Sequence, residues 1–311
     1  MPYRWISLLL AAALLPELWV SHGFGMEEET TAPTEPAVDA GALPYPDAWE
    51  ADGRPVVQTQ IGEMSGSGYL TLTDGVQMQN LTEYPDSSLL TAARLQPELS
   101  CTDKTEPQVL VLSVHTSESY EPYERTQASS GFCYRTTDPR YDLAAVGRSI
   151  CLQLEAAGVG AVQSAELFDA PSCIGAGQRC AQAEAALLEE YPSVQAVITV
   201  ERAELWREDA VMQPVTEVGG RNAAQVRVIC GVPDGLPDMQ QGLRLACQWQ
   251  LQMGEDWSGL VLPMCVEPDD RADTDGICRL TLEVGSFGNT VGQAQYAAEL
   301  AGSSLARVLL R

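Results

Sequence analysis

The stretch that decides the fold is Gln108-Val109-Leu110-Val111-Leu112-Ser113-Val114, a run of aliphatic and β-branched residues. Such a run, with almost no polar alternation, is typical of a strand that is buried on both faces. Similar apolar runs occur at 162–168, 194–200, 225–230, 260–266 and 279–284. Stretches with helical spacing of apolar residues lie between or after them, at 142–157, 178–190, 237–253 and 291–310. This alternation predicts an α/β fold: a three-layer, mostly parallel twisted sheet with helices on both faces.

Composition narrows the class of protein. The chain has 311 residues, a formal net charge of −25 and 45% hydrophobic residues. That apolar fraction is typical of a globular protein rather than a disordered one. So many negative charges, without basic clusters, argue against nucleic acid as a partner. Only two histidines are present, His22 and His115, so any site that needs two imidazoles has to use both.

The N-terminus has the pattern of an export signal. Arg4 precedes an apolar block at 5–15, which is too short for a membrane-spanning helix and matches the apolar region of a secretory signal. Residues 1–23 are therefore predicted to be a signal peptide that is cleaved, or a membrane anchor that is kept. Either outcome makes the protein extracytoplasmic, and cleavage would leave His115 as the last histidine.

The remaining chain divides by composition. Residues 24–56 are acidic and proline-rich with little periodicity, which predicts a solvated linker. Residues 57–100 carry short alternating runs and a Thr73-Asp74-Gly75 turn, which predict a small β element. The α/β domain is expected to occupy residues 101–311.

The nine cysteines lack paired Cys-x-x-Cys spacing, so a zinc ribbon is not expected. In an oxidising compartment some of them can pair, and the local candidates are Cys173 with Cys180 and Cys265 with Cys278. Within apolar segments, cysteine more often acts as a small buried hydrophobe. That interpretation is favoured for Cys151, Cys230 and Cys247.

Candidate site residues follow three of the predicted strands. Open sheets of this kind place their sites beyond the carboxyl ends of the strands. The segments there are His115-Thr116-Ser117-Glu118, Glu201-Arg202-Ala203-Glu204, and Glu283 with the following 285–290. An imidazole and carboxylates at adjacent strand ends can hold a divalent metal, with another carboxylate as the base. The alternative is structural: Thr290 caps the last helix, and Glu201 and Arg202 pair with each other or with neighbours.

The same segments resemble a known family, the stage II sporulation protein P family of exported peptidoglycan amidases. The resemblance rests on 109–120, on Tyr141-Asp142-Leu143-Ala144-Ala145-Val146-Gly147, and on Glu283-Val284-Gly285-Ser286 with Asn289-Thr290. Residues 75–82 resemble the short β motif before the family's catalytic domain. The ordered set spans roughly 57–311.

The resemblance implies an N-acetylmuramoyl-L-alanine amidase with a zinc amidase-like fold, which acts on peptidoglycan and works among other cell-wall or sporulation proteins. In that family a zinc ion activates water and a glutamate shuttles the proton. Carried over by position, His115 and Glu118 match metal-site residues, and Glu283 matches the catalytic glutamate.

Several positions depart from the family pattern. Glu201 stands where the second zinc histidine is expected, Ser113 replaces the first histidine of a His-x-His segment, and Phe168 replaces another. The expected metal set is therefore His115, Glu118 and Glu201, which suits zinc less well than calcium or manganese. Two hypotheses follow: a weakened metal-dependent amidase, or an inactive relative that binds peptidoglycan or a cell-wall partner.

One motif favours a different class. Gly175-Ala176-Gly177 before a predicted helix mimics a dinucleotide-binding fingerprint, with Glu201 as the later acidic residue. Cys180 stands at its third glycine position, and exported proteins rarely meet such cofactors. Serine or cysteine hydrolase chemistry lacks supporting spacing around His115.

Overall fold

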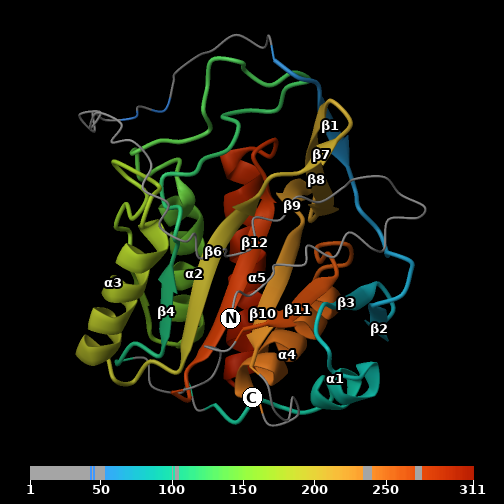
Figure 1. The fold of residues 1–311 in the computed structure, drawn as a ribbon, viewed down its shortest axis with the longest axis vertical. Helices are drawn as coiled ribbons and strands as arrows, with labels where there is room; N and C mark the ends of the chain where they lie inside the picture. The colour runs from blue at the N-terminus through green and yellow to red at the C-terminus, as the bar shows by residue number, and fades with distance from the viewer. Residues whose placement is uncertain are drawn as a thin grey trace, which may run out of the picture.

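The structure is a computed structural model that describes Leu43, Tyr45, residues 53–99, Cys101 and residues 105–233, 240–269 and 275–311. A central sheet with helices on both sides dominates it (Figure 1). The predicted signal segment, 1–23, lies outside the described residues. In the part of the chain that is described, no helix is both long and apolar enough to cross a bilayer.

The central sheet has eight strands in the order β2-β3-β11-β10-β12-β6-β4-β5. Their bounds are β2 Tyr69–Thr73, β3 Val76–Asn80, β4 Val109–Leu112, β5 Ala161–Gln163, β6 Ala196–Ala203, β10 Val226–Val232, β11 Met264–Pro268 and β12 Cys278–Ser286. Strands β12, β6, β4 and β5 are parallel, as are β3, β11 and β10. The two groups meet in an antiparallel pair between β10 and β12. The predicted α/β class is thus confirmed, with an antiparallel junction that the sequence analysis did not predict.

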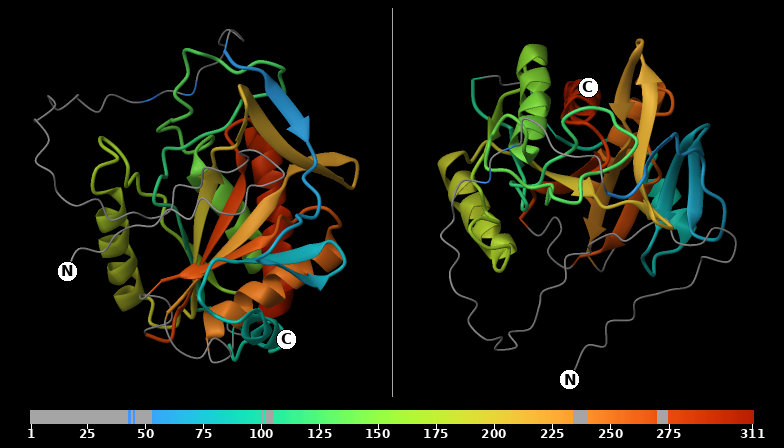
Figure 2. Two further views of the ribbon diagram at one scale, coloured as in Figure 1. Left: turned by 45° about the vertical axis from the view of Figure 1, so that its right-hand side comes forward. Right: turned by 90° about the horizontal axis from the view of Figure 1, so that it is seen from above.

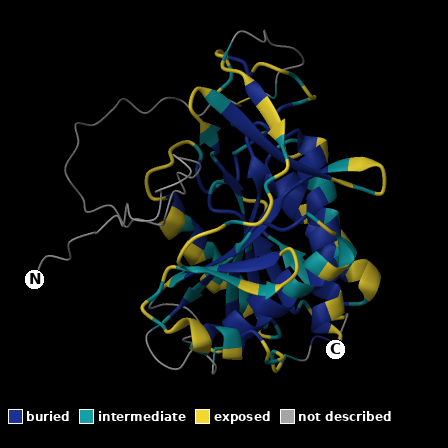
Figure 3. Ribbon diagram, turned by 90° about the vertical axis from the view of Figure 1, so that its right-hand side faces the viewer, coloured by how far each residue is buried: buried dark blue, intermediate teal, exposed yellow. Residues whose placement is uncertain are grey.

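Helices cover both faces of this sheet. They are α1 Asp86–Ala92, α2 Leu143–Ala157, α3 Ala176–Glu190, α4 Gln241–Asp256 and α5 Val291–Leu309. Along β4, Val109 and Val111 join the main core with α2, α4 and α5, whereas Leu110 and Leu112 join a second cluster with α3. Burial on both faces explains the continuous apolar run that predicted the strand. Figure 3 shows the buried residues concentrated in the sheet and the inner helix faces.

Local caps set the helix ends. Thr290 accepts a hydrogen bond from the Gln293 backbone N–H at 3.1 Å, and the Gln293 side chain accepts one from Thr290 N–H at 3.1 Å. This reciprocal capping box starts α5, as expected for Thr290. Asp142 caps α2, which ends at Gly158 in the left-handed conformation with φ 94°.

A second, smaller sheet lies beside the main one. It contains β1 Val56–Thr59, β7 Trp206–Arg207, β8 Ala210–Val218 and β9 Arg221–Ala224. Strand β1 pairs in parallel with β8, and β8 turns into β9 through Gly219 and Gly220, which both have positive φ. Figure 2 shows β1, in blue, next to the gold strand β8. Strand β1 begins at the boundary of the short alternating runs predicted within 57–100, whereas the strands within 206–224 were not predicted.

The cysteines are all free thiols. Cys151, Cys230 and Cys247 lie in the main hydrophobic core, which confirms their interpretation as buried hydrophobes. The proposed local pairs are not formed: Cys265 lies on β11 and Cys278 on β12, with β10 between them, and Cys173 is exposed while Cys180 is buried. Strand order therefore keeps one pair apart although its members are close in sequence.

Packing between α2 and α5 generates a prediction. A Cβ on Gly302 of α5 would lie 3.0 Å from the backbone Cα and O of Ile150 on α2. We expect Gly302→Val to lower the free energy of unfolding by about 1–3 kcal/mol, because the helices must separate. Gly292→Val is the matched control, because a Cβ there would meet only Thr290 Oγ1, at an ordinary contact distance of 3.9 Å, and it is expected to leave stability unchanged or slightly raised. Urea denaturation of both variants measures the difference; equal stabilities would contradict this account of the packing.

Candidate functional site

The candidate site forms where parallel strands end together. Strands β4, β6 and β12 are neighbours running in one direction, so their carboxyl ends share one edge of the sheet. His115 follows β4, Glu201 lies near the end of β6, and Glu283 lies directly opposite Glu201 in the register of β12. The structure thus brings the three predicted segments to the same edge.

A buried arginine completes this row of side chains. Arg227, on β10, is the register partner of Glu283, and its Nη2 lies 2.8 Å from Glu283 Oε2. Both side chains are about nine-tenths buried, with 8% and 10% exposed. Because β10 runs antiparallel to β12, the start of β10 meets the end of β12. Sequence reasoning missed Arg227 because it looked only beyond strand ends; the one available signal was a charge within the apolar run at 225–230.

Two further guanidinium groups flank Glu118. Arg202 Nε lies 3.4 Å from Glu118 Oε2, and Arg135 Nη2 lies 3.7 Å from Glu118 Oε1. Arg202 also donates from Nη1 to the Ser119 carbonyl at 2.5 Å. Arg202 thus pairs with a neighbouring carboxylate, as the structural interpretation of this residue predicts.

Hydrogen bonds to the Asp169 carboxylate hold the turn that carries His115 and Glu118. The Asp169 carboxylate accepts hydrogen bonds from Ser117 N–H at 3.0 Å, from Ser117 Oγ at 2.7 Å and from Arg135 Nη1 at 2.8 Å. Glu118 N–H donates to the His115 carbonyl at 2.9 Å, which closes the turn. Asp169 is thus a positioning residue for the loop after β4.

Glu201 lies in an unfavourable environment for a charge. Burial, and then repulsion from Glu118 and from Glu283, raise the pKa of Glu201 to about 8. Its Oε1 atom is buried without a hydrogen-bond partner, as is Nδ1 of His115. These two atoms are available to a further donor, acceptor or ligand.

The side chains present do not fit the zinc ion that the resemblance implies. Among the residues described, no group of three or more His, Cys, Asp or Glu side chains is arranged to hold a metal. Glu118 faces Arg135 and Arg202, and Glu283 is bound to Arg227, so positive charge already lies beside these carboxylates. A zinc ion would have to compete with these guanidinium groups for the carboxylates, and His115 is the one imidazole at the site that could help to bind it. The metal-ligand roles of His115, Glu118 and Glu201, and the catalytic role of Glu283, stay predictions.

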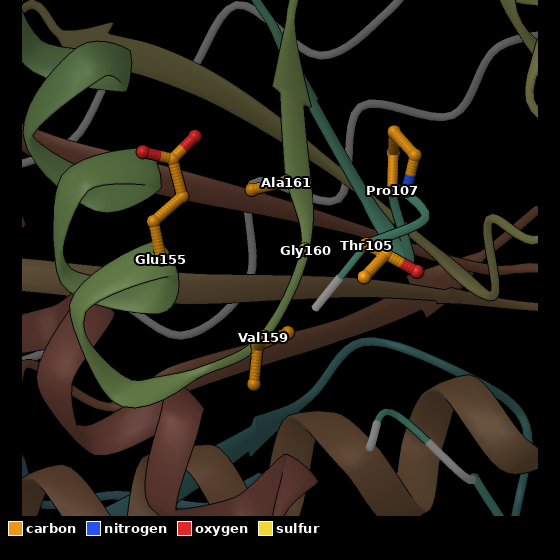
Figure 4. Close-up of a pocket in the computed structure, with 6 residues that line it drawn as sticks. All are labelled: Thr105, Pro107, Glu155, Val159, Gly160 and Ala161. Carbon is orange, nitrogen blue, oxygen red and sulfur yellow. The ribbon is translucent and has the colours of Figure 1, made fainter. Parts of the chain in front are cut away.

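A hollow lies elsewhere, near the amino ends of β4 and β5. It has a volume of about 340 Å³ and is lined by Thr105, Pro107, Glu155, Val159, Gly160 and Ala161 (Figure 4). Pro107 precedes β4 and Ala161 begins β5, so this hollow is at the opposite edge from His115. Among the described residues that line it, Glu155 alone is charged, so these residues supply no convergent polar groups.

The buried pair of Arg227 and Glu283 predicts a charge-balance effect. We expect Arg227→Met to lower the free energy of unfolding by about 3–5 kcal/mol, because Glu283 would stay buried without its counter-charge. The double variant Arg227→Met/Glu283→Gln should recover at least half of that loss. Urea unfolding of the single variants and the double variant measures the coupling, and strictly additive losses would show that the pair does not interact.

The raised pKa of Glu201 predicts a pH effect. The folded state holds the proton of Glu201 up to about pH 8, whereas the unfolded chain releases it near 4.5. Glu201 therefore costs stability progressively as the pH rises from 4.5 to 8. We expect Glu201→Gln to match the parent at pH 5 and to exceed its stability at pH 8.5 by at least about 1 kcal/mol. Glu204→Gln controls for the loss of one negative charge; a difference that is independent of pH would contradict the prediction.

Comparisons with known proteins identify a family. The family model of Stage II sporulation protein P matches residues 61–309. Among solved structures, the amidase AmiC2 of Nostoc punctiforme is similar at 12% identity and a TM-score of 0.36, covering 65% of this chain and 95% of that one. The CwlD amidase of Clostridioides difficile, solved in complex with the GerS lipoprotein, is similar at 10% identity and a TM-score of 0.37, covering 65% and 94%.

These structural likenesses are distant, and none of the curated proteins matches the sequence. The family match does not depend on them, because it covers most of the chain. It includes the turn after β4, the end of β6 and the end of β12. The chain belongs to the Stage II sporulation protein P family.

Proposed function

We propose that this protein binds peptidoglycan outside the cytoplasm and does not cleave its N-acetylmuramoyl-L-alanine bond with zinc. Membership of the family supports a peptidoglycan hydrolase ancestry. The observation that carries the loss of cleavage is the pairing of both Glu118 and Glu283 with guanidinium groups. The Oε2 atom of Glu283 already contacts Arg227 at 2.8 Å, and both side chains are buried. We infer that Glu283 serves as the structural partner of this arginine rather than as a catalytic base.

The site retains a means of binding. Arg135 is the most accessible of the three arginines at the site, with 27% of its side chain exposed against 3% for Arg202 and 8% for Arg227. Stem peptides of peptidoglycan carry free carboxylates, which a guanidinium group binds through charge-assisted hydrogen bonds. We therefore propose that Arg135, which also pairs with Asp169 and Glu118, contacts a carboxylate of the stem peptide.

A second candidate function is a weakened metal-dependent amidase. The buried, unpartnered atoms Nδ1 of His115 and Oε1 of Glu201 favour it, because two such atoms can be satisfied by an added ligand. This candidate requires a metal to displace Arg202 or Arg135 from Glu118. It has the same substrate and differs in whether a bond is broken.

One experiment separates the two candidates. The exported chain is incubated with purified peptidoglycan, with and without zinc or manganese, and both sedimentation and released stem peptide are measured. We expect sedimentation with the wall and no release of stem peptide under any metal condition. Release that requires metal and disappears in Glu283→Gln would instead establish the amidase.

The same sedimentation assay tests whether Arg135 contributes to binding of peptidoglycan. We expect Arg135→Gln to weaken sedimentation with peptidoglycan about tenfold, in line with loss of a charged hydrogen bond. Arg140→Gln is the matched control, because Arg140 lies in the same loop, is 73% exposed and binds Asp138, two residues away, through its guanidinium group. Equal binding by both variants would remove Arg135 from the recognition site.

A further inference from the structure

The long loop between β4 and α2 carries much of the candidate site but little secondary structure of its own. It runs from Ser113 to Asp142 and contains His115, Glu118 and Arg135. Loops of this length are uncommon in compact domains unless they have a functional role or are held by other segments. Contacts with residues from the N-terminal part of the chain hold this loop in place.

The first anchor of the loop is Leu43, which belongs to the 24–56 segment whose composition predicts a solvated linker. Leu43 exchanges hydrogen bonds with the loop: its N–H donates to Thr137 Oγ1 at 3.0 Å, and its carbonyl accepts from Thr137 N–H at 2.8 Å. Thr136 Oγ1 donates to the same carbonyl at 2.7 Å. One of these contacts joins two backbones and two use threonine hydroxyls, and all of them connect residues more than ninety positions apart in the sequence.

Tyr45 makes the second anchor. Its ring stacks on Tyr141 with centroids 4.2 Å apart and meets Phe132 edge-on at 5.7 Å. Its hydroxyl donates to the Tyr120 carbonyl at 2.8 Å. Burial raises the pKa of the Tyr45 hydroxyl, in keeping with a group that is packed against the domain rather than solvated. Tyr45 therefore joins both ends of the loop, near Glu118 and near the start of α2.

A third anchor lies closer to β1. Gly53 N–H donates to the Ala128 carbonyl at 2.8 Å, and Ala128 N–H donates to the Arg54 carbonyl at 2.9 Å. A Cβ on Gly53 would lie 2.8 Å from the Ala128 carbonyl oxygen, so only glycine permits this approach. Figure 2 shows the blue segment that leads into β1 running next to the green loop.

We infer that Leu43, Tyr45 and residues 53–56 form an intramolecular strap that docks on the 113–142 loop and holds the candidate site in its observed arrangement. The docking surface consists of Phe132, Thr137, Tyr141 and the backbone of Tyr120 and Ala128. The strap lies before residue 61, where the family match begins.

Limited trypsin digestion of the full chain tests the strap. The loop contains three cleavage sites for trypsin, at Arg125, Arg135 and Arg140. We expect Tyr45→Ala and Gly53→Val, which disturb opposite ends of the strap, each to speed cleavage at these sites about tenfold, as loss of a hydrogen bond and an aromatic contact implies. Tyr45→Phe, which removes only the hydroxyl, should give an intermediate rate.

Matched controls separate the strap from general destabilisation. Leu152→Ala removes a side chain that is 56% exposed on α2, outside the loop, and Gly62→Val adds a side chain where nothing lies within 4 Å. Both should digest like the parent. Urea unfolding of all variants is measured in parallel. Unchanged digestion of Tyr45→Ala and Gly53→Val, or acceleration fully accounted for by a lower global stability, would overturn the strap; neither outcome depends on peptidoglycan binding.

Discussion

Strand β12 is the constraint on which the rest of the structure depends. It pairs in parallel with β6 on one side and antiparallel with β10 on the other. The parallel side places Glu283 opposite Glu201, and the antiparallel side places Arg227 opposite Glu283. Because partners in register point to the same face of a sheet, these three side chains form one row. The chemistry of the site follows from this row.

Charge balance then determines what the row can do. Burial makes a lone carboxylate costly, and the structure offers two solutions. Glu283 and Glu118 lie beside guanidinium groups, whereas the pKa of Glu201 is raised so that its neutral form persists near neutral pH. A hydrolytic metal site needs the opposite arrangement, with anionic ligands left free for the ion. This distribution of charge is the basis of the proposal that the site binds peptidoglycan without cleaving it.

The loop after β4 connects this edge to the N-terminal segment. Its inner side is fastened by Asp169 to the turn of Ser117, and by Tyr120, whose hydroxyl donates to the Val284 carbonyl at 2.9 Å. Its outer side is fastened by Leu43 and Tyr45. A loop without regular hydrogen bonding acquires a defined shape only when such contacts exist on both sides. Leu43 and Tyr45, which precede the domain in the chain, thus help to fix the loop that carries the candidate site.

The sequence by itself determined the α/β class, the capping of α5 by Thr290 and the family, because apolar periodicity and short ordered motifs are local signals. It also placed His115, Glu201 and Glu283 at one edge, since the parallel strands that carry them were predicted. It could not predict Arg227, whose importance arises from an antiparallel pairing between strands far apart in the chain. Nor could it predict the packing of Tyr45, because the composition of 24–56 is that of a solvated segment. Tertiary structure decided both, since burial and partner charge depend on which segments meet in space.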